Sequence, residues 1–287
     1  MGLFSKREEK EKEPQYYLSK TNIPTYNYKV YYMSLMQKII YFLIGFVVGA
    51  AVGYLFYGGI GKDEFGRATT TTIVLNITIP MIVGTAAGFI FLSSKNKSIV
   101  AKQKIDLGRQ FRDMLEALTT SLGAGKNVND SFFAVYEDLK IQYEEDAFIL
   151  KELEVIIAGI HNNIAIEEIL EDFGNRSDND DIMSFSNVFR IAYRKGGNIK
   201  DIIRNTHNIL SEKMEISEDI ETLMTSNKTE QNIMIIMPIL LIGLIKAMSP
   251  EFAHNFVTPS GIASTTISII IFVVAYFVGK SVLNIRI

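Results

Sequence analysis

Four long apolar segments constrain this chain more than any other feature of its sequence. They cover residues 39–60, 68–94, 233–248 and 255–279, and only the third contains a charged residue, Lys246. A bilayer core of about 30 Å needs about 20 apolar residues in a helix, so the other three segments are long enough to cross it. The third segment reaches that length if Lys246 extends to the interface or faces protein. The sequence therefore predicts four transmembrane helices.

Charge and cysteine content exclude several classes of protein. The chain has 287 residues, a net charge of -3 and no cysteine. A nucleic-acid binder normally carries a strong basic excess, which is missing here. The absence of cysteine excludes a disulfide framework and a thiolate metal site. The first apolar segment begins only at residue 39, so no cleavable signal peptide is expected, and the start "MGLFSK" lacks the Ser or Thr of a myristoylation motif.

Basic residues flank the apolar segments unevenly. Lysines gather before the first segment and after the second, whereas residues 249–261 contain no basic residue and residues 62–67 balance two basic residues against Asp63 and Glu64. Because cytoplasmic loops are enriched in Lys and Arg, both termini and the central segment are predicted to lie in the cytoplasm. The predicted organisation is a cytoplasmic N-terminal segment (1–38), two spans (39–94), a cytoplasmic helical domain (95–232), two further spans (233–279) and a cytoplasmic tail (280–287).

Tyrosines crowd the approach to the first apolar segment. Tyrosine favours the membrane interface, where its ring is shielded and its hydroxyl stays hydrated. We therefore predict an interfacial helix that leads into the first span, in preference to a ligand site. The tyrosines concerned are Tyr16, Tyr17, Tyr26, Tyr28, Tyr31, Tyr32 and Tyr41.

The segment between the second and third apolar segments has helical periodicity and almost no strand pattern. In "IDLGRQFRDMLEALTTSLGAG" apolar residues recur every three or four positions, which predicts a helix with one face in a core. That stripe consists of Leu107, Phe111, Leu115, Leu118 and Leu122. Further helices are predicted at residues 127–145, 146–162, 164–173 and 178–195, and a last one from about Asn198 into the third apolar segment.

Three similar turns separate these helices. The stretches "GKNV", "NIAI" and "GGNI" begin at Gly125, Asn163 and Gly196, and both residue types accept the left-handed conformation that ends a helix. The pair Gly196 and Gly197 resembles a phosphate-binding loop at first sight. A dinucleotide fingerprint needs a preceding strand and a third glycine, and neither is present. We therefore predict a turn between helices, with Asn198 capping the second helix.

The order of these elements resembles the F-type platform proteins of type II secretion and type IV pilus machines, most closely their tight-adherence (Tad, Flp pilus) branch. The matching stretches are "LEALTTSLGAGKNV", "AYRKGGNIKDIIRN", the helix through "SEKMEISEDIETLM", and Pro250, Glu251 and Phe252 after the third span. The resemblance covers the chain from about Tyr28 onwards. It implies an all-α polytopic membrane protein, with a cytoplasmic bundle of helical hairpins between spans 2 and 3.

The resemblance also implies a function. Such a protein is the non-enzymatic platform that couples a cytoplasmic ATPase to pilin assembly or export. Its expected partners are that ATPase, a sister platform protein, prepilin and the lipid bilayer, in a homo- or hetero-oligomer, with no cofactor and no nucleic acid. Many relatives carry an acid two positions before the double glycine. This chain has Arg194 there, followed by Lys195, so no metal site is carried over.

Two groups of residues stand out as functional candidates. Arg190, Arg194 and Lys195 precede the third turn and are a possible docking site for the ATPase. Asn76 and Lys246 are polar residues within spans, which usually face other helices or a cavity.

Several other residues have simpler explanations. Pro80 and Pro238, a residue type that tends to break helices, lie with Asn76 and Lys246 in or at the edges of the spans. Glu167 and Glu168 are expected on a solvated helix face, and the acidic run "SDNDDI" at a helix start, where acids suit the positive end of the helix dipole.

Two alternatives remain open. The first is a permease subunit whose cytoplasmic domain docks a transport ATPase. The second is a membrane enzyme that uses an unrecognised acidic site. No catalytic constellation is apparent in the sequence. The three histidines, His161, His207 and His254, are widely scattered.

Overall fold

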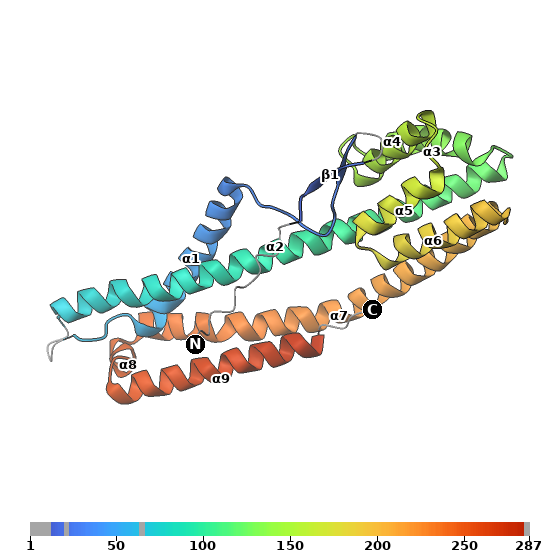
Figure 1. The fold of residues 1–287 in the computed structure, drawn as a ribbon. Coiled ribbons are helices and arrows are strands. Elements are labelled where there is room, and N and C mark those ends of the chain that lie inside the picture. The colour runs from blue at the N-terminus through green and yellow to red at the C-terminus, as the bar shows by residue number, and fades with distance from the viewer. Residues whose placement is uncertain (1–12, 20–22, 63–66, 284–287) are drawn as a thin grey trace, which may run out of the picture. The chain divides into compact units, whose positions relative to one another are not determined.

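The computed structural model describes residues 13–19, 23–62 and 67–283 and is 81% helical, which confirms the prediction of a mainly helical chain. Figure 1 shows the elements in chain order. They are β1 (Tyr16–Leu18), β2 (Pro24–Tyr26), α1 (Leu35–Tyr57), α2 (Thr70–Gly123), α3 (Val128–Gln142), α4 (Phe148–His161), α5 (Ile166–Ser177), α6 (Asp180–Lys195), α7 (Ile199–Met248), α8 (Pro250–Asn255) and α9 (Pro259–Leu283). Asp63 and Glu64, which entered the prediction of orientation, lie outside the described residues.

The chain divides into two compact units. Unit 1 combines the N-terminal segment up to Tyr32 with Asn96–Met214, and unit 2 combines Met33–Lys95 with Glu215–Ile287. Both α2 and α7 contribute residues to each unit. The division groups the N-terminal segment with the central helices, whereas the sequence suggested a separate segment 1–38 and a domain over 95–232.

Unit 1 is built around a single apolar core. The C-terminal half of α2 supplies Leu107, Phe111, Leu115 and Leu118, all with no exposed surface, which confirms these four residues of the predicted stripe. Leu122, the fifth, is partly buried and packs against the same core. The ring of Phe111 packs edge-on against those of Phe173 on α5 and Phe185 on α6, with centroids 6.1 and 5.3 Å apart. Apolar residues of α3, α4 and α7 complete the same core. Helices α5 and α6 pack against each other (Figure 1).

The N-terminal segment corrects the prediction of an interfacial helix. Residues 16–18 and 24–26 form an antiparallel pair of strands, in which Tyr16 lies opposite Tyr26. Aromatic residues favour strands, and these two rings meet edge-on at 5.4 Å. Tyr28 is fully buried in the core of unit 1, so it does not face a membrane interface. Residues 27–33 are not helical, and α1 begins only after its cap, Ser34.

The three turns have the backbone conformations that end helices. Gly125, Asn163 and Gly196 have φ angles of 89°, 54° and 71°, all in the left-handed region. The N–H of Gly197 donates to the carbonyl oxygen of Ala192 at 2.7 Å, which is one bond of a helix-terminating motif. Asn198 accepts a hydrogen bond from the N–H of Asp201 at 3.3 Å, as a helix cap does.

The acidic run also lies at a helix start, as expected. Asn179 caps α6 by accepting hydrogen bonds from the N–H groups of Asp181 and Ile182. Asp180 and Asp181 lie in the first turn of α6, at the positive end of its dipole.

Unit 2 contains the apolar segments. Among the described residues, four helices are long and apolar enough to cross a membrane, which are α1, α2, α7 and α9. The apolar stretches form only part of α2 and α7, which have 54 and 50 residues. Pro80 and Pro238 lie inside α2 and α7, and both helices continue past them. Apolar helices of this kind tolerate proline, because neighbouring groups satisfy the freed carbonyl.

Glycines on α1 let it approach α2 closely. Gly45, Gly49 and Gly53 are the buried residues of α1, and their spacing of four places them on one face. A Cβ atom added at Gly49 would lie 2.5 Å from the Cβ of Ala87 on α2. From the other side, a Cβ at Gly84 would lie 2.8 Å from the carbonyl oxygen of Phe46. Small residues at four-residue spacing are typical of tight helix pairs in membranes.

Candidate functional site

The predicted docking residues lie on the last two turns of α6. Arg190, Arg194 and Lys195 precede Gly196, whose left-handed conformation ends the helix. Basic residues are favourable at this end because the helix dipole is negative there. The close spacing of the three residues is therefore explained in part by helix stability alone.

Two of the three basic residues are held by acids of α5. Arg190 forms an ion pair with Glu171 at 2.5 Å, and Arg194 forms one with Glu167 at 3.2 Å. The two acids are four residues apart, as are the two arginines, so the pairs lie side by side between α5 and α6. The side chain of Glu167 is only 9% exposed, which corrects the expectation of a solvated acid. The partners are 19 and 27 residues apart in the sequence, so no local pattern predicted either ion pair.

The remaining positive charge lies next to the turn. Lys195 and Lys200 are exposed on either side of Gly196–Asn198, and neither forms an ion pair with any residue that the structure describes. By contrast, Arg204 pairs with Asp201 on the first turns of α7. The surface that carries net positive charge is therefore the turn itself, and the exposed pair Lys195 and Lys200 defines it.

A buried polar cluster lies elsewhere in unit 1 and was not predicted. Arg176 on α5 donates to both carboxylate oxygens of Glu152 on α4, at 2.9 and 2.8 Å. It also donates to Asp172 at 2.8 Å and to the carbonyl oxygen of Tyr26 at 2.8 Å. The hydroxyl of Tyr28 donates to Glu152 at 2.9 Å. These contacts fasten the N-terminal segment to α4 and α5.

Two members of this cluster, Tyr28 and Arg176, keep their protons near neutral pH. Burial, followed by the charge and hydrogen bond of Glu152, raises the pKa of Tyr28 well above its usual value, so its hydroxyl stays protonated. Burial alone lowers the pKa of Arg176, but its hydrogen bonds and charge interactions with Glu152 and Asp172 outweigh this, so the net shift is upward. Tyr28 is therefore a fixed donor and Arg176 a fixed cation, and the arrangement is suited to holding the chain rather than to proton transfer.

No local pattern in the sequence predicted this cluster. Tyr28 and Glu152 are 124 residues apart, and Glu152 and Arg176 are 24 apart. The one available signal was the spacing of Asp172 and Arg176 at i and i+4 on α5, which predicts an ion pair on a helix surface.

The polar residues of the apolar helices contact other parts of unit 2. The side-chain oxygen of Asn76 accepts a hydrogen bond from the N–H of Gly59 at 2.8 Å. The ammonium group of Lys246 donates to the carbonyl oxygen of Leu55 at 2.7 Å. The last carbonyls of a helix lack partners within the helix, so Lys246 satisfies one of them near the end of α1. Both residues therefore have a packing role within the protein.

The described residues bring together no group of three or more His, Cys, Asp or Glu side chains suited to a metal ion. His161 packs against the ring of Phe133 with centroids 5.1 Å apart, and the Nδ1 atom of His207 lies 3.4 Å from the carbonyl oxygen of Arg112. Comparisons with models of protein families, with curated proteins and with solved structures give no match.

Proposed function

We propose that this chain is the non-enzymatic membrane platform of a Tad-like or type IV-like pilus, or of a type II secretion machine. In this role it couples a cytoplasmic ATPase to the assembly or export of pilin. The proposal rests on the order of the stretches that resemble platform proteins and on the arrangement of the helices. Its partners are the ATPase, a sister platform protein and prepilin.

The observation that carries the proposal is the continuity of two helices. Helix α2 runs from an apolar segment into the core of unit 1, where it contributes Leu107 to Leu118. Helix α7 contributes Ile203 and Leu210 to the same core and continues into the apolar segment that ends at Met248. Two helices therefore connect the core of unit 1 to apolar segments without a break in the helix, and a platform driven by an ATPase requires a connection of this kind.

The orientation that we propose follows from charge. Unit 1 and both termini lie in the cytoplasm, because Lys95, Lys97, Lys102 and Lys104 follow the second apolar segment, whereas residues 249–261 contain no basic residue. In this arrangement the helices of unit 1 form the cytoplasmic bundle of hairpins, and the turn at Gly196 is accessible to a cytoplasmic partner.

The test is genetic and biochemical. Deletion of the gene should abolish surface pili or the secreted cargo, and the wild-type gene supplied in trans should restore them. The full-length chain, purified in detergent, should retain the assembly or secretion ATPase of the same organism. Normal piliation and secretion in the deletion strain, together with no retained ATPase, would refute the proposal.

A further inference from the structure

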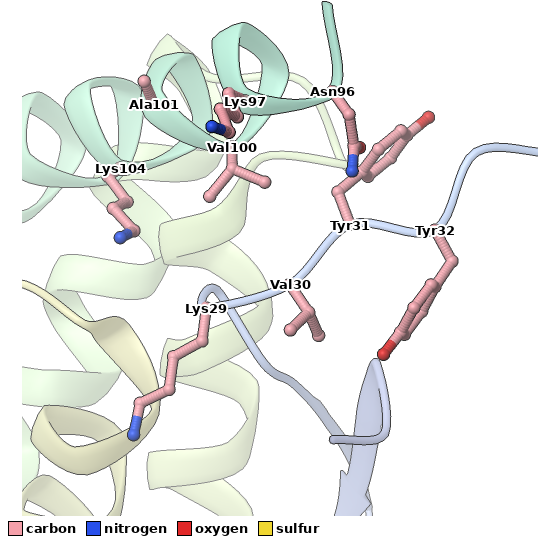
Figure 2. Close-up of a pocket in the computed structure, with 9 residues that line it drawn as sticks. All are labelled: Lys29, Val30, Tyr31, Tyr32, Asn96, Lys97, Val100, Ala101 and Lys104. Carbon is pink, nitrogen blue, oxygen red and sulfur yellow. The ribbon is translucent and has the colours of Figure 1, made fainter. Parts of the chain in front are cut away.

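A pocket of ≈ 440 Å³ lies in unit 1 between the segment that leads to α1 and one face of α2. Figure 2 shows Lys29 at a turn and Tyr31 and Tyr32 on the stretch of chain that follows it, with Asn96, Lys97 and Lys104 on the helix beside them. Residues 96, 97, 100, 101 and 104 all line the pocket, and their spacing of three, four and eight places them on one face of α2.

The pocket is positively charged. Three lysines and no acid line it. Lys104 forms an ion pair with Asp178, which lies outside the lining. Lys29 and Lys97 are exposed, and neither has an acidic partner among the residues that the structure describes. Two uncompensated ammonium groups at one pocket favour an anionic ligand.

One lining residue also requires a hydrogen-bond donor. The side-chain oxygen of Asn96 is buried and has no hydrogen-bond partner within the described parts of the chain. Buried polar atoms are rarely left without a partner. A ligand that carries a hydroxyl group beside its negative charge would supply both interactions.

The position of the pocket in the sequence indicates where such a ligand is found. Tyr31 and Tyr32 lie just before Ser34, the cap of α1, and Asn96 lies two residues after the apolar segment that ends at residue 94. The pocket is thus formed by the two stretches of chain that adjoin the first two apolar helices. Lipid headgroups lie at this level of a membrane protein, and lysines and tyrosines are enriched there.

We propose that this pocket binds a phosphate ester with a free hydroxyl, supplied by the headgroup of an anionic phospholipid. Lys29 and Lys97 neutralise the phosphate, and Asn96 accepts a hydrogen bond from the headgroup hydroxyl. The inference depends on the apolar helices and not on the platform role, so it stands or falls separately from the proposed function.

The first test measures protection of the lysines. The full-length chain is placed in nanodiscs of phosphatidylcholine, with or without phosphatidylglycerol, and acylation of each lysine is followed by mass spectrometry. Phosphatidylglycerol should slow the labelling of Lys29 and Lys97 more than that of Lys38 and Lys102. These two control lysines are exposed on α1 and α2 but do not line the pocket. Equal slowing of both pairs would overturn the proposal, because it would reflect the charge of the bilayer alone.

A soluble arm distinguishes the source of the phosphate. Glycerol phosphate is added to nanodiscs that contain phosphatidylcholine only. Protection by phosphatidylglycerol alone identifies a lipid headgroup. Protection by glycerol phosphate supports the phosphate site but identifies its ligand as a soluble phosphate ester instead of a lipid headgroup. Protection by neither compound overturns the site.

The second test compares two double variants with the same loss of charge. Lys29→Gln with Lys97→Gln should weaken the retention of phosphatidylglycerol, counted by native mass spectrometry, by about tenfold or more. The reason is that the loss of two lysines beside an anionic headgroup removes attraction that corresponds to at least this change in affinity. Lys38→Gln with Lys102→Gln should retain the lipid as wild type does. The proposal is wrong if the two double variants lose the lipid to the same extent.

Discussion

At the scale of single residues, Arg176 shows how a buried charge is tolerated in unit 1. Its side chain is 5% exposed and makes four hydrogen bonds, two of them to Glu152, whose side chain is 3% exposed. A buried ion pair contributes little net stability, but the loss of one partner leaves a buried charge that is uncompensated. The cluster therefore favours the docked position of the N-terminal segment, in which the Tyr28 hydroxyl donates to Glu152 and Arg176 donates to the Tyr26 carbonyl oxygen.

Replacement of Arg176 should destabilise unit 1 strongly. Arg176→Met removes the partner of the buried Glu152 carboxylate, which should cost about 3–5 kcal/mol. Tyr28→Phe removes one hydrogen bond to the same carboxylate and should cost on the order of 1 kcal/mol. The measurement is proteolysis of the full-length protein along a temperature ramp, with cleavage in residues 96–214 quantified by mass spectrometry.

Lys151→Met is the matched control for that experiment, because Lys151 is exposed and adjoins Glu152 on α4. It should melt as wild type does. If Arg176→Met and Lys151→Met unfold at the same temperature, the cluster does not stabilise unit 1.

At the scale of helices and strands, local patterns predicted some elements and missed others for physical reasons. Length and composition were enough for the four apolar helices, and a period of three to four residues was enough for the buried stripe of α2. The N-terminal strands have three residues each, and hydrogen bonds of Tyr26 and Tyr28 with Arg176, far along the chain, fix their place. No local sequence pattern predicts such distant contacts, so the tyrosine content alone led to the prediction of a helix at the membrane interface.

The candidate site also contains some features that the sequence predicted and others that depend on how the helices pack. Gly125, Asn163 and Gly196 were accessible from sequence, because the left-handed conformation is a local property of these residue types. The ion pairs of Arg190 and Arg194 depend on how α5 and α6 pack, and no spacing in the sequence shows it. The glycines of α1 did have a signal, since glycine every four residues in an apolar segment is typical of close helix packing.

Gly49 provides the test of that packing. Gly49→Leu places a side chain where even a Cβ would lie 2.5 Å from Ala87, so α1 and α2 must separate. Overpacking of this kind typically costs about 1–3 kcal/mol. The variant should aggregate at a lower temperature than wild type in detergent. Ala51→Leu, at an exposed position two residues away on α1, should behave as wild type, and equal effects would refute close packing at Gly49.

At the scale of the whole molecule, the apolar helices occur in two pairs, one before and one after the central helices in the sequence. The proposed orientation, with both termini in the cytoplasm, places the connection within each pair on the opposite side of the membrane. Truncation fusions should therefore report an external position after Gly61 and Ser260, and an internal position after Lys104 and Ile287. Paired reporters, one active outside and one inside, provide the measurement. An internal signal after Ser260 would exclude the four-span arrangement.

The last prediction concerns where the proposed ATPase binds to unit 1. The structure shows that Lys195 and Lys200 are better residues for this test than Arg190 and Arg194. Reversal of Arg194 would also break its ion pair with Glu167, so a loss of binding would be ambiguous. Lys195 and Lys200 are exposed beside the turn, and their reversal disturbs no ion pair among the described residues.

Lys195→Glu with Lys200→Glu should therefore weaken retention of the ATPase and reduce piliation, while the amount of protein in the membrane stays normal. Attraction between exposed charges is screened beyond a Debye length of about 8 Å at physiological salt, so the difference from wild type should shrink as salt rises. Lys126→Glu with Lys151→Glu makes the same change of charge at exposed positions on other parts of unit 1. If both double variants bind the ATPase equally at low salt, the turn at Gly196 is not the docking surface, because only the total charge of unit 1 would then matter.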